Sequence, residues 1–195
     1  VDISSISSKL NNIFSEIVKD KSGNLWIAAF NEGLSMIDLN KPLIQNYSFP
    51  SIREKTGFIT NIKNIYEDGD GDLWIDQNRW GVGIFNPGTN KLQLYTDIPS
   101  LKNVPNLRNI SCIISVPLLN EIWLGSEYYQ EIYRVKKEKD RIELLGTLNL
   151  SNYADNPGFP RIFYEDSKHN LWVVTTKGIL VKPEKEKNLQ DTKFP

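Results

Sequence analysis

Four tryptophans recur along the 195-residue chain at nearly constant intervals of 48, 49 and 49 residues: Trp26, Trp74, Trp123 and Trp172. Each has an aliphatic neighbour on both sides. An apolar residue also stands nine positions before each one, at Ile17, Ile65, Ile114 and Phe163. Self-similarity at a fixed period is the sequence signature of a repeat protein. We therefore expect four similar structural units that together account for essentially the whole chain.

The second copy divides into short apolar segments separated by turn residues. We expect strands at residues 61–67, 72–77, 81–86 and 91–96, with Asp-Gly-Asp-Gly at 68–71 and Pro-Gly-Thr-Asn at 87–90 as turns. The consecutive apolar residues Leu73, Trp74 and Ile75 indicate a strand buried on both faces, as in a sheet between two others. No segment keeps a helical period, so helix should be scarce.

Small four-stranded sheets that repeat at ~40–50 residues are the blades of a β-propeller. The fold class predicted is thus all-β, with four antiparallel four-stranded blades at about residues 11–50, 60–99, 107–150 and 158–195 of one propeller segment. These blades would form a partial propeller, a compact four-bladed one, or one half of a ring assembled from two chains.

The pattern Ile-x-x-Ile-x-Glu-Asp-x-x-Gly-Asp-Leu-Trp-Ile at residues 62–75 is echoed at 17–27 and at 164–173. In the third copy Pro117 stands where the other copies have Asp20, Asp68 and Asp166. This pattern resembles the two-component regulator propeller repeat, found in extracytoplasmic sensor regions of bacterial hybrid two-component systems. The resemblance covers nearly the whole chain.

The resemblance implies a non-enzymatic, periplasmic or extracellular module of a membrane-anchored sensor. It would recognise an oligosaccharide or related nutrient and signal through other domains to a histidine kinase absent from this chain. The alternative is a propeller scaffold for protein–protein interaction or receptor dimerisation. Sensor regions of this kind usually have about seven blades in a ring. Four blades would leave apolar faces exposed, so we expect a homodimer through those faces.

Composition excludes several other classes. The 23 basic and 24 acidic residues leave a net charge of -1, which gives no electrostatic case for nucleic-acid binding. No apolar run is long enough to cross a membrane, so a membrane is expected only through flanking segments. One cysteine, Cys112, and one histidine cannot build a zinc site of Cys and His ligands. The Gly-Val-Gly at 81–83 lacks the rest of a dinucleotide fingerprint, and we expect no cofactor or metal.

His169 is the one histidine and the first candidate for acid–base chemistry. In the repeat register it occupies the position of Gly23 and Gly71, in the turn before the tryptophan. Histidine tolerates the left-handed conformation better than most residues, so we interpret it as a turn residue. A single histidine also argues against streptogramin lyases, which are similar propellers whose chemistry needs more than one.

Acidic residues before the tryptophan suggest two other chemistries. Asp-x-Asp-x-Asp at 68–72 resembles the start of a calcium loop, but Leu73 and Arg79 occupy the later positions that require Gly and Glu. Adjacent carboxylates such as Glu67 and Asp68 point to opposite faces of a strand and cannot flank a glycosidic bond. We expect them to end the first strand and to bond the following turn, and we disfavour a lyase or glycosidase.

The candidate ligand-binding residues lie outside the repeat register. Trp80 has no counterpart in the other copies and stands beside Arg79 in the loop between the second and third strands. In propellers these loops share one rim with the connections between blades. Aromatic rings beside polar groups suit a sugar or a protein partner. The predicted site comprises Trp80, Arg79, Tyr128, Tyr129, Phe30, Glu32 and Arg53, with no catalytic residue. The alternative is that Trp80 and Tyr128 pack between neighbouring loops.

Overall fold

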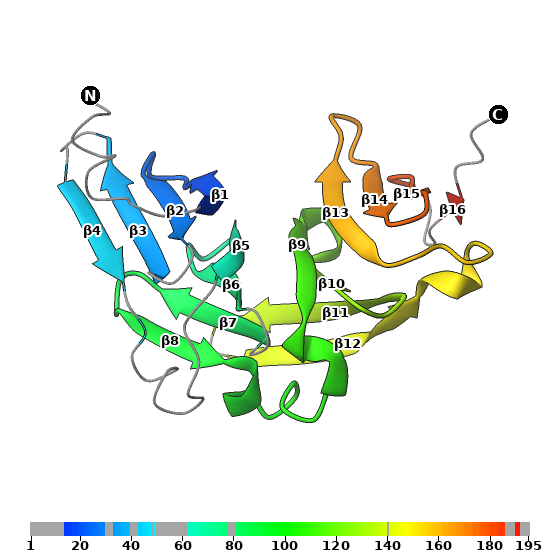
Figure 1. Cartoon of the computed structure of the whole chain (residues 1–195), viewed down its shortest axis with the longest axis horizontal. Coiled ribbons are helices and arrows are strands. Elements are labelled where there is room, and N and C mark those ends of the chain that lie inside the picture. Colours follow the sequence, from blue (N-terminus) through cyan, green and yellow to red (C-terminus); the bar gives the residue numbers. More distant parts are fainter. Residues whose placement is uncertain are drawn as a thin grey trace. The chain divides into compact units, whose positions relative to one another are not determined.

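The structure, a computed structural model, describes residues 14–29, 33–39, 43–47, 49, 62–77, 81–139, 141–185 and 190–191. These residues form four antiparallel sheets of four strands each (Figure 1), which confirms the all-β class and the propeller blades. The chain divides into two compact units, Val1–Asn78 with Gly83–Leu92 and Arg79–Val82 with Gln93–Pro195. The first unit holds blade 1 and most of blade 2, and the second holds blades 3 and 4.

Each blade is a meander in which strands adjacent in sequence pair with one another. Blade 1 consists of β1 (Phe14–Lys19), β2 (Leu25–Ala29), β3 (Gly33–Asp38) and β4 (Leu43–Tyr47). Blade 2 consists of β5 (Ile62–Glu67), β6 (Leu73–Gln77), β7 (Gly81–Asn86) and β8 (Lys91–Leu94). Blade 3 consists of β9 (Ile110–Val116), β10 (Glu121–Ser126), β11 (Glu131–Glu138) and β12 (Arg141–Asn149). Blade 4 consists of β13 (Pro160–Glu165), β14 (Leu171–Thr175), β15 (Ile179–Lys182) and β16 (Gln190–Asp191).

Helix is confined to single turns among the described residues. Four 3-10 helices occur there, at Tyr95–Asp97, Pro105–Arg108, Pro117–Leu119 and Leu150–Asn152. The first of them corrects one predicted boundary, because β8 ends at Leu94 and not at Thr96. The Tyr95 ring is buried at this turn.

A carboxylate accepts the indole N–H of the repeat tryptophan in every blade. The Nε1 to carboxylate distances are 2.8 Å for Trp26 and Asp20, 2.9 Å for Trp74 and Asp68, and 2.9 Å for Trp172 and Asp166. The same aspartates also accept backbone N–H groups of the turn, as in the bonds to Asp68 from Asp70 and Asp72 at 2.9 and 3.1 Å. The predicted role of these aspartates in bonding the turn is confirmed. Their hydrogen bond to the indole also connects the turn to the buried tryptophan.

The third repeat makes the same bond with a different residue. Pro117 removes the aspartate, and Glu121, two positions before Trp123, accepts the indole N–H at 2.8 Å. Arg134 on β11 also pairs with Glu121, with Nε donating at 2.7 Å. Burial alone would raise the pKa of Glu121, but the hydrogen bonds from Arg134 and Trp123 outweigh it and hold the pKa below its usual range.

The conformation of the turn before the tryptophan explains His169. Its φ is 59°, in the left-handed region where Gly23 and Gly71 have φ of 90° and 84°. The expected turn role is therefore confirmed. The imidazole Nδ1 also lies 2.6 Å from a carboxylate oxygen of Glu165, and this contact raises the pKa of the exposed histidine.

In the first unit the core lies between blades 1 and 2. The ring of Phe85 on β7 packs at 6.3 Å from that of Trp26, and it also contacts Tyr47 and Phe49 at 5.1 and 5.3 Å. Polar bonds join the same two blades, since the Lys21 backbone N–H donates to Glu67 at 3.0 Å and its Nζ donates to the Asp68 carbonyl at 2.9 Å.

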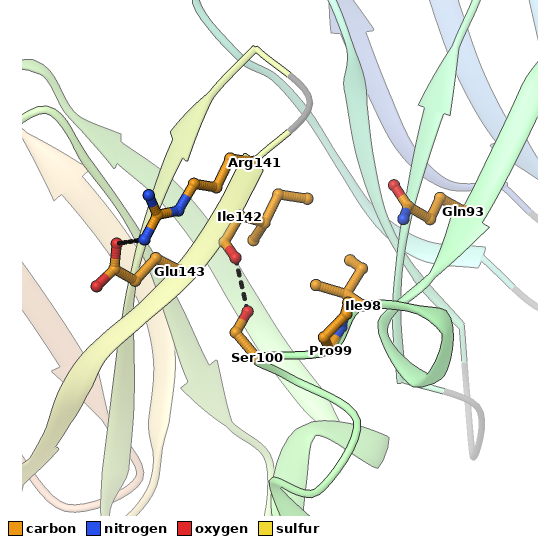
Figure 2. A pocket seen from close by; sticks show the side chains of 7 residues that line it. All are labelled: Gln93, Ile98, Pro99, Ser100, Arg141, Ile142 and Glu143. Carbon is orange, nitrogen blue, oxygen red and sulfur yellow. Dashed lines mark hydrogen bonds and ion pairs between the residues drawn. The ribbon is translucent and has the colours of Figure 1, made fainter.

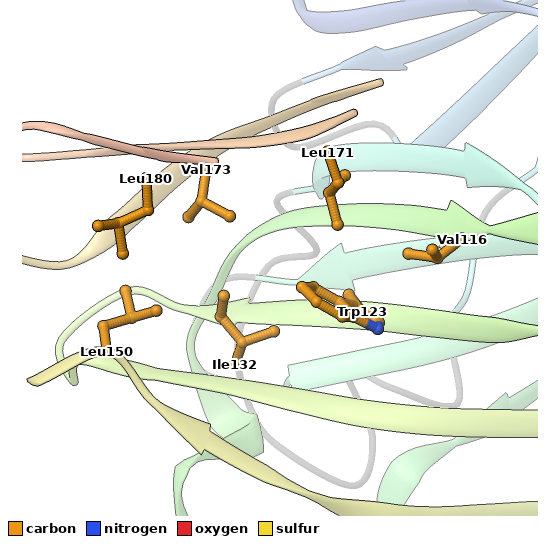
Figure 3. Close-up of a cluster of buried hydrophobic side chains, with 7 residues drawn as sticks. All are labelled: Val116, Trp123, Ile132, Leu150, Leu171, Val173 and Leu180. Carbon is orange, nitrogen blue, oxygen red and sulfur yellow. The ribbon is translucent and has the colours of Figure 1, made fainter. Parts of the chain in front are cut away.

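In the second unit the core lies between blades 3 and 4 (Figure 3). Trp123 on β10 and Ile132 on β11 face Leu171, Val173 and Leu180 of blade 4. Phe163 on β13 packs against the edge of this cluster. The consecutive apolar residues Leu73, Trp74 and Ile75 of β6 are all under 2% exposed, as predicted for a second strand that is buried on both faces.

Candidate functional site

The structure describes two of the seven predicted site residues, Tyr128 and Tyr129. They lie in the loop of residues 127–130 between β10 and β11, and their side chains are 54% and 48% exposed. Trp80, Arg79, Phe30, Glu32 and Arg53 lie outside the described residues. Their grouping with the two tyrosines therefore stays a prediction.

Backbone hydrogen bonds fix both ends of the tyrosine loop. The Glu127 N–H donates at 2.8 Å to the carbonyl of Asn109, at the end of the connection that enters blade 3. The Gln130 carbonyl accepts at 2.7 Å from the N–H of Leu150, at the start of the connection that leaves blade 3. The loop and both connections therefore lie at the same edge of blade 3, as expected for a propeller rim. Because these backbone hydrogen bonds hold both ends of the loop, the two tyrosine rings project from a backbone of fixed conformation.

The buried side chain of Tyr133 forms hydrogen bonds next to the loop of residues 127–130. The hydroxyl of Tyr133 donates to Glu131 at 2.5 Å, and the side-chain amide of Asn106 donates to the same carboxylate oxygen at 3.2 Å. Burial, and then the adjacent Glu131 carboxylate, raise the pKa of Tyr133 well above its usual range. The phenol therefore stays protonated and acts as a hydrogen-bond donor, not as an acid or base near neutral pH.

Blade 4 has the same arrangement at the corresponding edge. Thr176, in the β14–β15 loop, exchanges two hydrogen bonds with Phe159, at 2.9 and 3.0 Å. The Thr175 hydroxyl donates to the carbonyl of Pro157. Gly158 has φ of 77°, and a Cβ there would lie 2.4 Å from the Thr176 hydroxyl oxygen. We call this edge, made of residues 105–109, 127–131, 150–159 and 176–178, the rim of the second unit.

The chemistry available at this rim is that of binding. Tyr128 and Tyr129 offer aromatic faces, and Arg108 adds an exposed guanidinium on the connection that enters blade 3. Within the described part of the chain, no group of three or more His, Cys, Asp or Glu side chains is placed to hold a metal ion. An exposed aromatic ring takes the apolar face of a pyranose or packs against a protein side chain.

A separate pocket of about 450 Å³ lies on outer strands of the second unit (Figure 2). It lies between the segment Ile98–Ser100 and the start of β12, and its full lining is Gln93, Ile98, Pro99, Ser100, Arg141, Ile142 and Glu143. The Ser100 hydroxyl donates to the Ile142 carbonyl at 2.7 Å, so one backbone acceptor of the edge strand β12 has a hydrogen-bond partner. Sequence reasoning did not identify this pocket, since its lining has no motif or spacing.

The outer pocket is a weaker candidate than the rim. Arg141 and Glu143 pair with each other at 3.4 Å, and both are largely exposed (Figure 2). A ligand would have to displace the water around this exposed ion pair. Exposed ion pairs contribute little free energy, so we expect little gain from binding there. Only Ile98 and Ile142 offer large apolar side chains, and no aromatic ring lines the pocket.

The blades define the chain as a β-propeller. No family model matches it, and no curated protein matches it in sequence. Among solved structures, the extracellular domain of a hybrid two component system from B. thetaiotaomicron matches with a TM-score of 0.69 and 18% identity, over 91% of this chain and 22% of that one.

Propellers with other activities have similar blades. PorZ, a surface component of the type-IX secretion system of Porphyromonas gingivalis, matches with a TM-score of 0.65 and 16% identity, over 90% of this chain and 26% of that one. A gluconolactonase from Xanthomonas campestris matches with a TM-score of 0.62 and 12% identity, over 91% and 60%. This chain therefore spans about a fifth to three fifths of the length of these structures.

These likenesses confirm the propeller fold, and at such identities they do not decide between sensor, assembly component and enzyme. Among the residues that the structure describes, no helix is both long and apolar enough to cross a membrane.

Proposed function

We propose that this chain is an extracytoplasmic, ligand-sensing propeller module of a two-component signalling protein, without enzymatic activity of its own. The observation that carries the proposal is the braced pair of exposed rings, Tyr128 and Tyr129, at the rim. Exposed aromatic rings of this kind suit ligand recognition. Among the described residues beside them, we find no pair of carboxylates and no activated nucleophile. Likeness in fold to the extracellular domain of a hybrid two component system supports the sensor class.

The ligand class that fits this rim best is a soluble oligosaccharide. Tyrosine faces stack on the apolar faces of sugar rings, and neighbouring polar groups bind the hydroxyls. The exposed Arg108 and the backbone of the connections supply such groups. The buried Tyr133 hydroxyl is already bonded to Glu131, so this side chain supports the surface and does not contact a ligand.

Titration of intrinsic tryptophan fluorescence with a panel of plant and host oligosaccharides tests this proposal. Saturable binding should be lost in Tyr128→Ala and Tyr129→Ala, and a Trp80→Phe variant tests whether that residue shares the site. Leu118→Ala is the matched control, because Leu118 is as exposed as the tyrosines but lies in the β9–β10 turn at the other end of the blade. Binding that Tyr128→Ala and Tyr129→Ala leave unchanged would contradict the rim assignment.

The second candidate is a scaffold for protein–protein interaction. Likeness in fold to a component of a secretion system supports this class, and exposed tyrosines are enriched at binding hot spots. The scaffold would be favoured if no glycan of the panel changed the tryptophan fluorescence and if Tyr128→Ala abolished the capture of a protein partner. Turnover of a chromogenic glycoside would instead contradict both candidates.

A further inference from the structure

One carboxylate at the rim of the second unit has an oxygen that no described group occupies. Glu131, the first residue of β11, is partly exposed and directly follows the loop that carries Tyr128 and Tyr129. Its Oε2 accepts the hydroxyl of Tyr133 at 2.5 Å and the side-chain amide of Asn106 at 3.2 Å. Among the described residues, no donor bonds to its Oε1. Glu131 therefore presents one open acceptor at the rim.

The two partners of Glu131 hold this acceptor in a fixed direction. The Tyr133 side chain is only 2% exposed, and Asn106 lies in the 3-10 turn Pro105–Arg108. Both donate to the same carboxylate oxygen, so the other oxygen keeps its orientation. A polar group that is fixed before a ligand arrives loses less conformational entropy on binding. Glu131 is thus preorganised as an acceptor.

The last residue of β12, Asn149, is preorganised as a donor. Its exposed side chain accepts through Oδ1 from the Ser151 N–H at 3.0 Å and from the Ser151 hydroxyl at 2.5 Å. A backbone N–H can only donate, so this bond determines which end of the amide is oxygen. The NH₂ group, Nδ2, is then the open end, and no acceptor in the described part of the chain bonds to it.

Strand pairing brings the open acceptor and the open donor together. Glu131 and Asn149 are directly opposite each other in the antiparallel pair β11–β12, so their side chains lie on the same face. The next pair along is hydrogen-bonded, since the Leu150 N–H donates to the Gln130 carbonyl. Glu131 and Asn149 therefore form a pair without backbone bonds between them, the kind in which opposite side chains approach most closely.

The chemistry that matches this arrangement is a pair of adjacent hydroxyls. One hydroxyl of a sugar ring can donate to the open oxygen of Glu131, while its neighbour accepts from the open NH₂ of Asn149. The exposed rings of Tyr128 and Tyr129, three and two residues before Glu131, offer apolar faces on which a sugar can stack. A uronate or sulfate group would instead meet the negative charge of the Glu131 carboxylate.

We propose that Glu131 and Asn149 form a subsite that binds two adjacent hydroxyls of a neutral sugar. This assignment rests on the proposed function, and it narrows the class of ligand from oligosaccharides in general to neutral ones. Tyr128 and Tyr129 stack on the sugar, and the opposed carboxylate and amide select it by its hydroxyls. Tyr133, Asn106 and Ser151 position the two side chains and do not contact the sugar.

Isothermal titration calorimetry with defined glycans tests the subsite. The neutral probes are cellohexaose, xylohexaose and mannohexaose, and the acidic probes are a galacturonic acid oligosaccharide and a heparin oligosaccharide. At least one neutral probe should bind the wild-type chain, and more tightly than either acidic probe.

Two single substitutions each change one open group and keep the bonds behind it. Glu131→Gln retains an oxygen for Tyr133 and Asn106 but turns the open acceptor into a donor. Asn149→Asp retains the acceptor for Ser151 but turns the open donor into an acceptor. Each should weaken binding of the neutral probe by at least about tenfold. Both should melt within about 2 °C of the wild-type chain, because neither removes a bond within the fold.

The double variant Glu131→Gln with Asn149→Asp exchanges the donor and the acceptor and restores the net charge. A hydroxyl can either donate or accept, so the double variant should bind the neutral probe more tightly than either single variant. Glu143→Gln is the matched control. It makes the same change of charge on an exposed residue of β12 outside the rim, and it should leave binding unchanged.

The possible failures separate the subsite from the proposed function. A neutral probe that binds the wild-type chain and both single variants equally would overturn the subsite alone. Tighter binding of an acidic probe would do the same, and so would a double variant that binds no better than the weaker single variant. If no probe bound the wild-type chain, the proposed oligosaccharide sensing would be overturned, and the subsite with it.

Discussion

Glu121 accepts the indole N–H of Trp123 at 2.8 Å and so replaces, from within the strand, the aspartate that the other three repeats place six residues before the tryptophan. The hydrogen bond has been kept although the sequence position of its acceptor has moved. The contact, and not the residue, is what the four blades share.

Removal of the Glu121 carboxylate should destabilise blade 3. Glu121→Ala leaves the indole N–H of Trp123 and the guanidinium of Arg134 without their acceptor, and we expect a loss of ~2–4 kcal/mol in the free energy of unfolding. Glu121→Gln keeps one oxygen for the indole and should lose less. Urea unfolding followed by tryptophan fluorescence measures both. Equal stability of Glu121→Ala and the wild-type chain would show that the bond contributes nothing.

The four tryptophans should differ in their contribution to stability. Trp26→Ala, Trp74→Ala and Trp123→Ala each empty a buried aromatic site, and each should cost ~3–5 kcal/mol. Trp172→Ala should cost only ~1–2 kcal/mol, because Trp172 is partly exposed and its removal leaves a smaller cavity. Chemical denaturation of the four variants gives the comparison. A loss for Trp172→Ala as large as the others would mean that its outer side is covered in solution.

Gly125 provides a test of packing between blades 3 and 4. A Cβ at this position would lie 2.5 Å from Cys112 Sγ and 3.0 Å from Pro160 Cβ, so Gly125→Ala should cost ~1–3 kcal/mol through overpacking. Gly178→Ala is the matched control. A Cβ there meets nothing within 4 Å, so it should change the free energy of unfolding by under ~0.5 kcal/mol. Indistinguishable melting curves for the two variants would contradict the packing described here.

The chain should lose stability in acid. Hydrogen bonds from Asn170 and then Trp172 lower the pKa of Asp166, and hydrogen bonds outweigh burial to lower those of Asp20 and Glu121. A carboxylate whose pKa is lower in the folded state stabilises above its unfolded pKa of ~4, and that stabilisation is lost as the pH falls through the folded pKa. We expect a small gain in the free energy of unfolding as the pH falls from 7 to about 6 and His169 becomes protonated beside Glu165, and a decline below about pH 4. Glu121→Gln should make that decline shallower.

The two tyrosines of the rim should be dispensable for folding. Tyr128→Ala and Tyr129→Ala remove exposed rings and should each cost under ~1 kcal/mol, as measured by urea unfolding. Loss of ligand binding in these variants then reports on the site and not on misfolding. A large loss of stability would instead show that the rings pack between neighbouring loops.

The repeat made the fold predictable, because the period, the turn residues and the apolar second strand all repeat with the blade. The aspartate at Asp68 predicted a bonded turn, but the indole partner depends on strand pairing that brings Trp74 back beside the turn. Glu121 was not predicted, since its only signal is an acid two positions before Trp123. Exposed apolar faces were expected for four blades, but nothing in the pattern around Trp172 distinguishes this residue from its buried counterparts.

The rim was less predictable than the blades, for a physical reason. Loops carry no hydrophobic period, and their backbone conformations depend on contacts such as those of Glu127 with Asn109 and of Leu150 with Gln130. The structure shows that Tyr128 and Tyr129 are exposed, but their role in a ligand site stays a prediction, as does that of Trp80 and its neighbours.

The link from carboxylate to indole spans at most six residues in every blade, so each sheet carries its own internal fastening. Because the bond lies within one blade, the sequence of a single repeat contains both of its partners. A gene segment encoding one blade can be duplicated or lost without breaking the fastening of any other. On the ribosome, the first two strands of a blade can form their bond from carboxylate to indole once the tryptophan has emerged, before the following blade is made.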